Sequence, residues 1–427
     1  MKPYPKYKDS GVEWIGKVPD EWEVKRIKYS FRLITEKNCS LQMKKVALEN
    51  IESWTGRFID SEGDYQGEGI LFRKGDILFG KLRPYLAKVL NAKFSGASVG
   101  DIFVMRPEFG ISSRFAFYRF LSKPFIDIVD GSTFGAKMPR VSWNFIANLP
   151  IAVPGYDEQT AIAVYLDRKT AQIDNLISKK QKLIELLKEE RAAIINQAVT
   201  KGLNPDVPMK DSGIEWLGEI PAHWEVKRMK YVARITLGKM LTNVDKGGYH
   251  YRPYLRAQNI NWEKVNVEDV KKMWFSKDEL RQYRLNKNDL LVSEGGEVGR
   301  TSIWNEEIEE CYIQNSVHKV TMEPTNDPFF FLYTFCLYGE KGVFESVVSR
   351  ISIAHLTKEK LKEIPFPMPP TDEQRRISKF IRSETTKIDQ TISKIKKQID
   401  LLQEFRTALI SEVVTGKIDV RDEGLNG

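Results

Sequence analysis

Two segments of the chain carry apolar residues at a seven-residue spacing, and each predicts a long helix. In the first segment one position of the stripe is taken by Lys180, whereas the second stripe is unbroken. A heptad spacing kept over four repeats favours a coiled coil. The predicted pairing seam is Leu166, Ile173, Leu187 and Ile194 against Ile381, Ile388, Ile395, Leu402 and Leu409.

The flanking residues set the expected limits of these helices. Asp157 and Asp372 stand where a helix N-cap is expected, after prolines that block an earlier start. Gly202 and Gly416 mark the expected ends. Each helix would then be about 65 Å long at 1.5 Å per residue. The pattern allows the helices to pair in either direction, and it also allows each helix to pack only on its own domain.

The chain contains an internal duplication. Residues 8–29 (KDSGVEWIGKVPDEWEVKRIKY) and 210–231 (KDSGIEWLGEIPAHWEVKRMKY) are identical at 15 of 22 positions. The tripeptide DEQ at residues 157–159 returns at 372–374, and LENI at 48–51 aligns with AQNI at 257–260. A repeat of about 200 residues indicates two tandem domains, because solenoid repeats are only about 20–50 residues long.

Between each repeated head and its long helix lies a middle segment with a mixed pattern. Residues 75–90 and 288–304 predict strand, glycine-containing turn and strand. Residues 99–105 and 317–322 predict further strands, and residues 115–125 and 329–338 predict short helices. The predicted limits are 1–29 and 207–231 for the heads, 30–148 and 232–363 for the middles, and 149–206 and 364–427 for the spacers with their helices.

Composition narrows the class of protein. The 427 residues are 41% hydrophobic and 29% charged, which suits folded domains, and the longest apolar run is about half of a membrane span. We therefore expect a soluble, cytoplasmic protein. Three widely spaced cysteines and four scattered histidines predict neither a disulfide framework nor a metal site. The net charge of +8 is weak support for a polyanion partner.

Catalytic motifs are missing from the sequence. Residues 295–301 (GGEVGRT) have neither the spacing nor the lysine of a P-loop, and there is no GxSxG. No NPPY-type methyltransferase tetrapeptide is present. We expect no catalytic residues in this chain.

The middles instead offer basic and amide side chains among aromatic ones, and these side chains pair with phosphates and with the edges of guanine and adenine. The alternative is a solvated charged surface. The candidate DNA-binding residues are Arg73, Lys74, Lys81, Arg83, Tyr85, Lys88, Lys137 and Arg140 in the first middle, and Arg252, Arg256, Gln258, Asn259, Arg300, Arg350 and His355 in the second.

The tandem heads, the segments LPIAVPGYDEQTAI and IPFPMPPTDEQRRI, and the helices after them resemble the specificity subunit of type I restriction-modification enzymes. The resemblance implies an α+β fold with two similar mixed α/β target recognition domains. Two long helices would join them as an antiparallel coiled coil with pseudo-two-fold symmetry. Each domain would read half of a bipartite, asymmetric site in double-stranded DNA.

The resemblance also implies partners. Two modification subunits would methylate adenine with S-adenosylmethionine, and restriction subunits would use ATP and Mg; this chain would bind none of these cofactors and would not contact a membrane. Two other classes stay open. One is a stand-alone DNA-binding or regulatory protein, and the other is a nuclease or methyltransferase, which would need a catalytic cluster.

Overall fold

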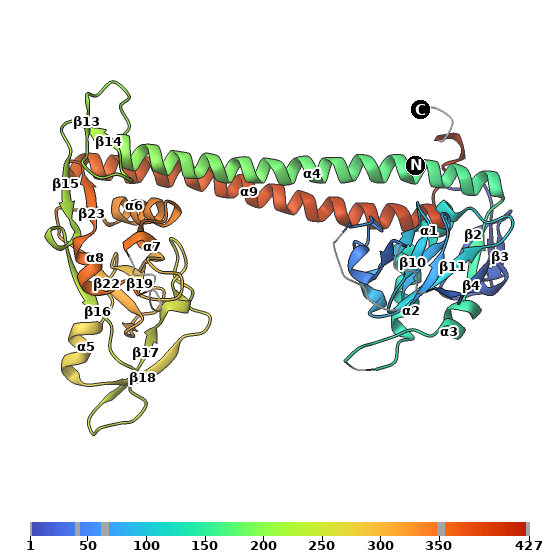
Figure 1. The fold of residues 1–427 in the computed structure, drawn as a ribbon, viewed down its shortest axis with the longest axis horizontal. Coiled ribbons are helices and arrows are strands. Elements are labelled where there is room, and N and C mark those ends of the chain that lie inside the picture. Colours follow the sequence, from blue (N-terminus) through green and yellow to red (C-terminus); the bar gives the residue numbers. More distant parts are fainter. Residues whose placement is uncertain (1, 39–42, 61–67, 136, 348–354, 424–427) are drawn as a thin grey trace. The chain divides into compact units, whose positions relative to one another are not determined.

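The structure, a computed structural model, describes residues 2–38, 43–60, 68–135, 137–347 and 355–423. It divides into two compact units, and each is described by itself. The first unit contains residues 1–182 and 395–427, and the second contains residues 183–394. Two long helices, α4 (Tyr156–Lys201) and α9 (Thr371–Val414), each contribute one half to each unit (Figure 1).

The recognition domain of the first unit is built on two four-stranded sheets. The antiparallel sheet β4–β11–β8–β9 consists of Phe31–Ile34, Ile102–Pro107, Ile77–Gly80 and Val89–Asn91. The sheet β5–β7–β10–β6 consists of Lys37–Asn38, Gly69–Phe72, Gly96–Ser98 and Lys45–Val46. Every residue of β8 is buried, which explains its unbroken apolar run, since both of its faces are covered.

Three short helices complete this domain: α1 (Ser113–Leu121), α2 (Lys123–Gly131) and α3 (Trp143–Asn148). Helix α1 packs on β8 and β9. The prediction of one short helix over residues 115–125 is wrong, because Ser122 is extended (ψ 141°) and ends α1 before α2 begins. Pro124 suits the first turn of α2, where its missing N–H is not needed.

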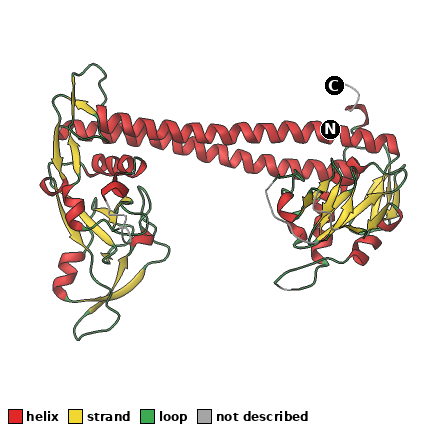
Figure 2. Cartoon of the chain, in the orientation of Figure 1, coloured by secondary structure: helices red, strands yellow, loops and turns green. Residues whose placement is uncertain are grey.

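The second unit repeats the main sheet with different additions. Its sheet β16–β22–β19–β20 consists of Ala233–Leu237, Val317–Met322, Leu290–Ser293 and Thr301–Ile303. A smaller sheet, β18–β17–β21, consists of Lys271–Phe275, His250–Leu255 and Tyr312–Ile313. The helices are α5 (Lys277–Tyr283), α6 (Pro328–Glu340), α7 (Val343–Val347) and α8 (Lys358–Glu363) (Figure 2). The predicted strand–turn–strand segments and both further strands are confirmed in the two units.

The repeated heads hold the start of the long helices. In the first unit β1 (Tyr7–Asp9) pairs with β2 (Lys17–Pro19), and β3 (Glu23–Arg26) pairs with β12 (Pro150–Val153), the strand that leads into α4. In the second unit β13 (Met209–Asp211) pairs with β14 (Glu219–Pro221), and β15 (Glu225–Arg228) pairs with β23 (Pro365–Met368), which leads into α9. Trp22 and Trp224 are fully buried in these heads. The heads are therefore structural.

The long helices pack side by side and antiparallel in both units (Figures 1 and 2). In the first unit Lys180 Nζ donates to Gln398 Oε1 at 2.7 Å. Asp174, six residues earlier on α4, pairs with Arg406, which lies further along α9. In the second unit Arg191 pairs with Asp389 at 3.1 Å. As the residue numbers on α4 increase from Asp174 to Arg191, the numbers of their partners on α9 decrease from Arg406 to Asp389. The two helices therefore run antiparallel, a direction that the sequence left open.

The predicted seam lies between these helices. Six of its residues are buried: Leu166, Ile173, Ile381, Ile388, Ile395 and Leu409. Leu187, Ile194 and Leu402 are half-buried. The predicted N-caps are misplaced by two residues, because α4 begins at Tyr156 and α9 at Thr371, so Asp157 and Asp372 lie inside the first turn. Their charge there still suits the positive end of the helix.

Candidate nucleic-acid interface

The central strands β8 and β19 each end at a cluster of polar residues, which we call the strand-end clusters. Lys81 follows β8; its N–H donates to Asp101 O and its carbonyl accepts from Val141 N. Glu294 follows β19; its N–H donates to Ser316 O and its carbonyl accepts from Leu356 N. Arg140 directly precedes Val141, and His355 directly precedes Leu356. The two clusters therefore share one backbone frame.

The first strand-end cluster is Lys81, Asp101 and Arg140. Arg140 forms a bidentate ion pair with Asp101, in which Nη2 lies 2.9 Å from Oδ2. Lys81 Nζ lies 3.6 Å from Oδ1 of the same carboxylate. The hydrogen bond from Arg140 lowers the pKa of Asp101, and the charge of Lys81 adds to this effect. Two cations thus share one carboxylate, and the partly exposed guanidinium keeps donors for a phosphate or a guanine edge.

Three other candidates of the first domain lie beside this cluster. Arg83 is exposed, and its N–H donates to Pro139 O, which joins it to the segment that carries Lys137 and Arg140. Its left-handed backbone (φ 51°) is uncommon for a residue with a side chain. Tyr85 is 47% exposed, and Lys137 is exposed.

The remaining candidates of the first domain are not part of this group. Arg73 and Lys74 are exposed, but they lie in the turn before β8, at the opposite end of that strand from Lys81. Lys88 is half-buried, and its ammonium donates to Leu48 O at 2.6 Å. The DNA contact expected of Lys88 stays a prediction, and this hydrogen bond makes its ammonium less available than that of Lys81.

The second strand-end cluster is Glu294, Ser316 and His355. His355 is exposed, and an ideal Cβ placed on Gly295 would lie 3.4 Å from its Nδ1, so the ring covers the glycine loop. Burial raises the pKa of Glu294, and the nearby His355 opposes that shift. Arg350, another candidate, lies outside the described residues.

The arginines of the second domain are paired with acidic residues. Arg252 pairs with Glu310, Arg256 with Asp269, and Arg300 with Glu297. Arg300 also donates to Ala257 O at 3.0 Å. These side chains are only partly exposed, so DNA contact would require them to share or exchange their partners.

The two amide candidates differ in their availability. Gln258 is exposed and donates to Asp269 at 3.3 Å. Asn259 is 2% exposed; its Oδ1 accepts from Arg256 N, and its Nδ2 donates to Asn266 O and Asp269 O. The DNA contact expected of Asn259 stays a prediction, although its amide is bound to the backbone here. Asn50 accepts equivalently from Ala47 N, so the shared asparagine of LENI and AQNI has a structural role.

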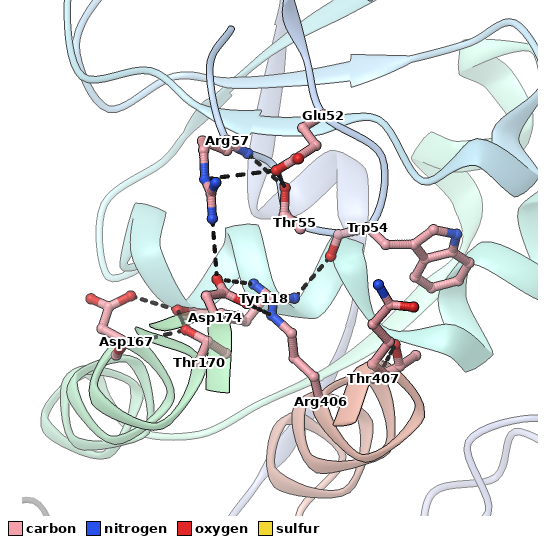
Figure 3. A network of polar contacts seen from close by, with 11 residues as sticks. Glu52, Trp54, Thr55, Arg57, Tyr118, Asp167, Thr170, Asp174, Arg406 and Thr407 are labelled. Carbon is pink, nitrogen blue, oxygen red and sulfur yellow. Dashed lines mark hydrogen bonds and ion pairs between the residues drawn. The ribbon is translucent and has the colours of Figure 1, made fainter. Parts of the chain in front are cut away.

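Each recognition domain is fastened to the long helices through an arginine. In the first unit Arg406 on α9 is 6% exposed and bonds to Asp174 on α4 at 2.9 Å and to the carbonyl of Trp54 at 2.9 Å (Figure 3). Arg57 extends the network to Asp174 at 3.7 Å. The Tyr118 hydroxyl donates to Asp167 on α4 at 2.6 Å.

The second unit repeats this fastening 215 positions away on the helices, where Arg191 and Asp389 match Arg406 and Asp174. Arg191 bonds to Asp389 and, at 2.8 Å, to Glu263. Glu263 and Trp54 have the same left-handed backbone (φ 67° and 62°) and match in the alignment of AQNI with LENI. Burial opposes the charge of Arg191, but the carboxylates of Glu263 and Asp389 outweigh it and raise its pKa.

The glutamine of each DEQ tripeptide makes a second attachment between the domain and its long helix. The repeat of this tripeptide is visible in the sequence, but the sequence does not explain its role. Gln159 accepts from Ser112 N and donates to Gly110 O and Pro154 O. Gln374 accepts from Asp327 N and donates to Pro369 O. Both are 1% exposed. They tie the start of each long helix to the N-cap of α1 or α6.

Glu294 is not among the candidate DNA-binding residues, because these were chosen for basic and amide side chains. The alignment of residues 75–78 with 288–291 places Glu294 opposite Lys81, and that correspondence was the available signal. Among the described residues, no helix is long and apolar enough to cross a membrane. Within the same residues, no group of three or more His, Cys, Asp or Glu could hold a metal ion.

Comparisons with known proteins agree with this architecture. The family model described as "Type I restriction modification DNA specificity domain" matches residues 221–401. The MjaVIII specificity subunit of Methanocaldococcus jannaschii is 24% identical over 95% of both chains, and the MjaIX specificity subunit of that organism is 23% identical over 96% of both.

Solved structures share the fold. A chain from a study of complex assembly and conformational transition of the type I R-M system covers 94% of this chain and 99% of its own, with a TM-score of 0.75 and 16% identity. The HsdS subunit of Thermoanaerobacter tengcongensis covers 96% of this chain and all of its own (100%), with a TM-score of 0.56 and 17% identity. Residues 221–401 thus match the type I restriction modification DNA specificity domain, and nearly the whole chain is similar to type I restriction enzyme specificity subunits.

Proposed function

We propose that this chain reads a bipartite, asymmetric sequence in double-stranded DNA, with one recognition domain on each half-site. It scaffolds two modification subunits and, through them, restriction subunits, in the cytoplasm. The chain itself holds no cofactor and performs no catalysis; S-adenosylmethionine, ATP and Mg belong to the partner subunits.

The observation that carries this proposal is the contrast between the strand-end clusters. Their backbone frame is the same, yet one presents Lys81 and Arg140 and the other presents Glu294 and His355. Structural contacts of the duplicated fold are retained, as with Gln159 and Gln374. A difference in the polar side chains carried by a shared backbone frame suits two modules that read different bases.

The long helices also offer surfaces for the partner subunits. Large apolar side chains on them are 41–53% exposed: Leu176, Leu401 and Phe405 in the first unit, and Leu183, Leu186 and Phe380 in the second. Exposed apolar side chains gathered on a helix are typical of protein interfaces. These residues support docking of modification subunits on the helix pair.

The test is co-expression of the full chain with a type I modification subunit, followed by co-purification and sequencing of the sites methylated in a plasmid library. We expect a stable complex that methylates one bipartite motif, and no methylation by the purified chain alone. Specific DNA binding without any partner would instead favour the stand-alone regulator. Methylation or cleavage by the chain alone would contradict the non-catalytic assignment.

A pair of variants tests whether the exposed face of α9 is the docking surface for the modification subunit. Replacing Leu401 and Phe405 with Glu places two charges on the exposed face of α9 in the first unit, and we expect the modification subunit to be lost from the co-purified complex. Phe109→Glu alters an equally apolar side chain that is fully exposed in the loop between β11 and α1, outside the long helices. Equal loss in both variants would show that the helix face is not the docking surface.

A further inference from the structure

The carboxylate of Glu294 stands where the first domain has a cation. Both residues follow a completely buried strand, and in both units the neighbouring segment runs directly into a capped helix, with Ser142 capping α3 and Thr357 capping α8. The frame therefore presents one side chain from the strand end and one from the residue two positions before the helix N-cap. At these two positions the backbone frame is the same and the chemistry of the side chains differs between the units.

The surroundings of Glu294 leave its carboxylate available. It is half-buried, and no described residue donates a hydrogen bond to its side chain. Burial raises the pKa of Glu294, and the charge of Glu359 on α8 does the same, whereas His355 lowers it. A carboxylate that is partly withdrawn from water gains free energy from any donor that reaches it.

The loop after Glu294 permits a close approach. A Cβ placed on Gly296 would meet no described residue within 4 Å, and its φ of 77° suits glycine. Among the described residues, the exposed His355 ring is what lies over Gly295. A large ligand can therefore reach Glu294 along the glycine backbone without displacing core side chains.

We propose that Glu294 is a specificity-determining residue whose carboxylate accepts a hydrogen bond from the exocyclic amino group of a cytosine or an adenine in the major groove. This inference rests on the proposed function. A carboxylate repels the phosphates, so it gains at a DNA surface only where a base edge supplies a donor. Guanine O6 and thymine O4 are acceptors, and Glu294 rejects them.

The test uses the complete complex with its modification subunits and a DNA library randomised over both half-sites. Wild type is compared with Glu294→Ala and with the isosteric Glu294→Gln. At one position of one half-site, wild type prefers cytosine or adenine, and Glu294→Ala reduces that preference roughly 5- to 150-fold. Glu294→Gln shifts it toward adenine, because an amide both accepts and donates.

Glu359→Gln is the matched control, since it removes a neighbouring carboxylate whose charge acts on Glu294. It leaves the preferred bases unchanged. Unchanged base preference in both Glu294 variants, an equal change in affinity for every sequence, or a guanine or thymine at the affected position overturns the inference. If wild type itself shows no sequence preference, the proposed function fails and the assignment of Glu294 fails with it.

Discussion

The two units fasten their recognition domains in the same way and differ in what they present to solvent. Arg406 with Asp174 in the first unit and Arg191 with Asp389 in the second hold matching turns of the two domains. At the strand ends the same frame carries two cations in one unit and a carboxylate with an imidazole in the other. In a duplicated fold, contacts that both units keep are thus candidates for a structural role. Side chains that differ at equivalent backbone positions are candidates for DNA recognition.

The fastenings themselves are not identical, which provides a graded test. Arg406 has one carboxylate and a backbone carbonyl as partners, and its side chain is 8% exposed, whereas Arg191 has two carboxylates and is 20% exposed. The first arginine is thus the more deeply buried cation.

The largest effect is expected from Arg406→Met in the full chain. It leaves Asp174 and the carbonyl of Trp54 without their main donor, which should lower the free energy of unfolding of the first unit by about 3–5 kcal/mol. Arg191→Met should cost about 1–3 kcal/mol, since water reaches the carboxylates that it leaves behind. Urea unfolding followed by hydrogen exchange resolves the two units, and equal losses would contradict the ranking.

The next largest effect on stability is expected at the seam between the two long helices. Ile395 is 6% exposed and matches Lys180, which reaches Gln398 at the helix surface. Ile395→Lys should cost about 1.5–3 kcal/mol, because the buried apolar side chain is lost. Lys180→Ile, the reciprocal change, should leave stability unchanged or raise it. Thermal unfolding measures both, and an unchanged melting temperature for Ile395→Lys would show that this position tolerates a charge.

Asn259 and Gln258 are neighbours in one turn, and replacing each of them separately distinguishes a structural role from a role in DNA recognition. Asn259→Ala should destabilise the second unit by about 1–3 kcal/mol, because three backbone groups lose their partner. Gln258→Ala should leave the free energy of unfolding within about 0.5 kcal/mol. DNA binding by each folded variant completes the comparison, and a stable Asn259→Ala chain with altered base preference would show that Asn259 reads a base.

The smallest effect concerns pH. Burial raises the pKa of Glu294, so its carboxylate takes up a proton at a higher pH than an ordinary glutamate, whose value is about 4.3. A protonated carboxyl no longer repels guanine O6, so base discrimination at its position should weaken as the pH falls from neutral. His355 and Glu359 face the same carboxylate and remain in Glu294→Gln, which should show no such weakening if Glu294 is responsible. The measurement is base preference against pH in both proteins.

The sequence by itself determined the duplication, the two long helices and the seam residues, because heptad spacing and repeated motifs are local patterns. It also placed the buried strands β8 and β19, whose unbroken apolar runs stand out against their polar turns. Candidate readers could be chosen only by residue type, which does not distinguish an exposed Arg83 from a Lys88 bound to Leu48 O.

Only the tertiary structure decided which of these side chains are free to meet a ligand. Asn259 has the right chemistry for adenine, but folding surrounds it with backbone partners drawn from a turn up to ten residues away. The direction of the helix pair likewise depends on contacts such as Arg191 with Asp389, between residues 198 positions apart. Burial and partnership arise from residues distant in sequence, so a local pattern can name a side chain but cannot show what it touches.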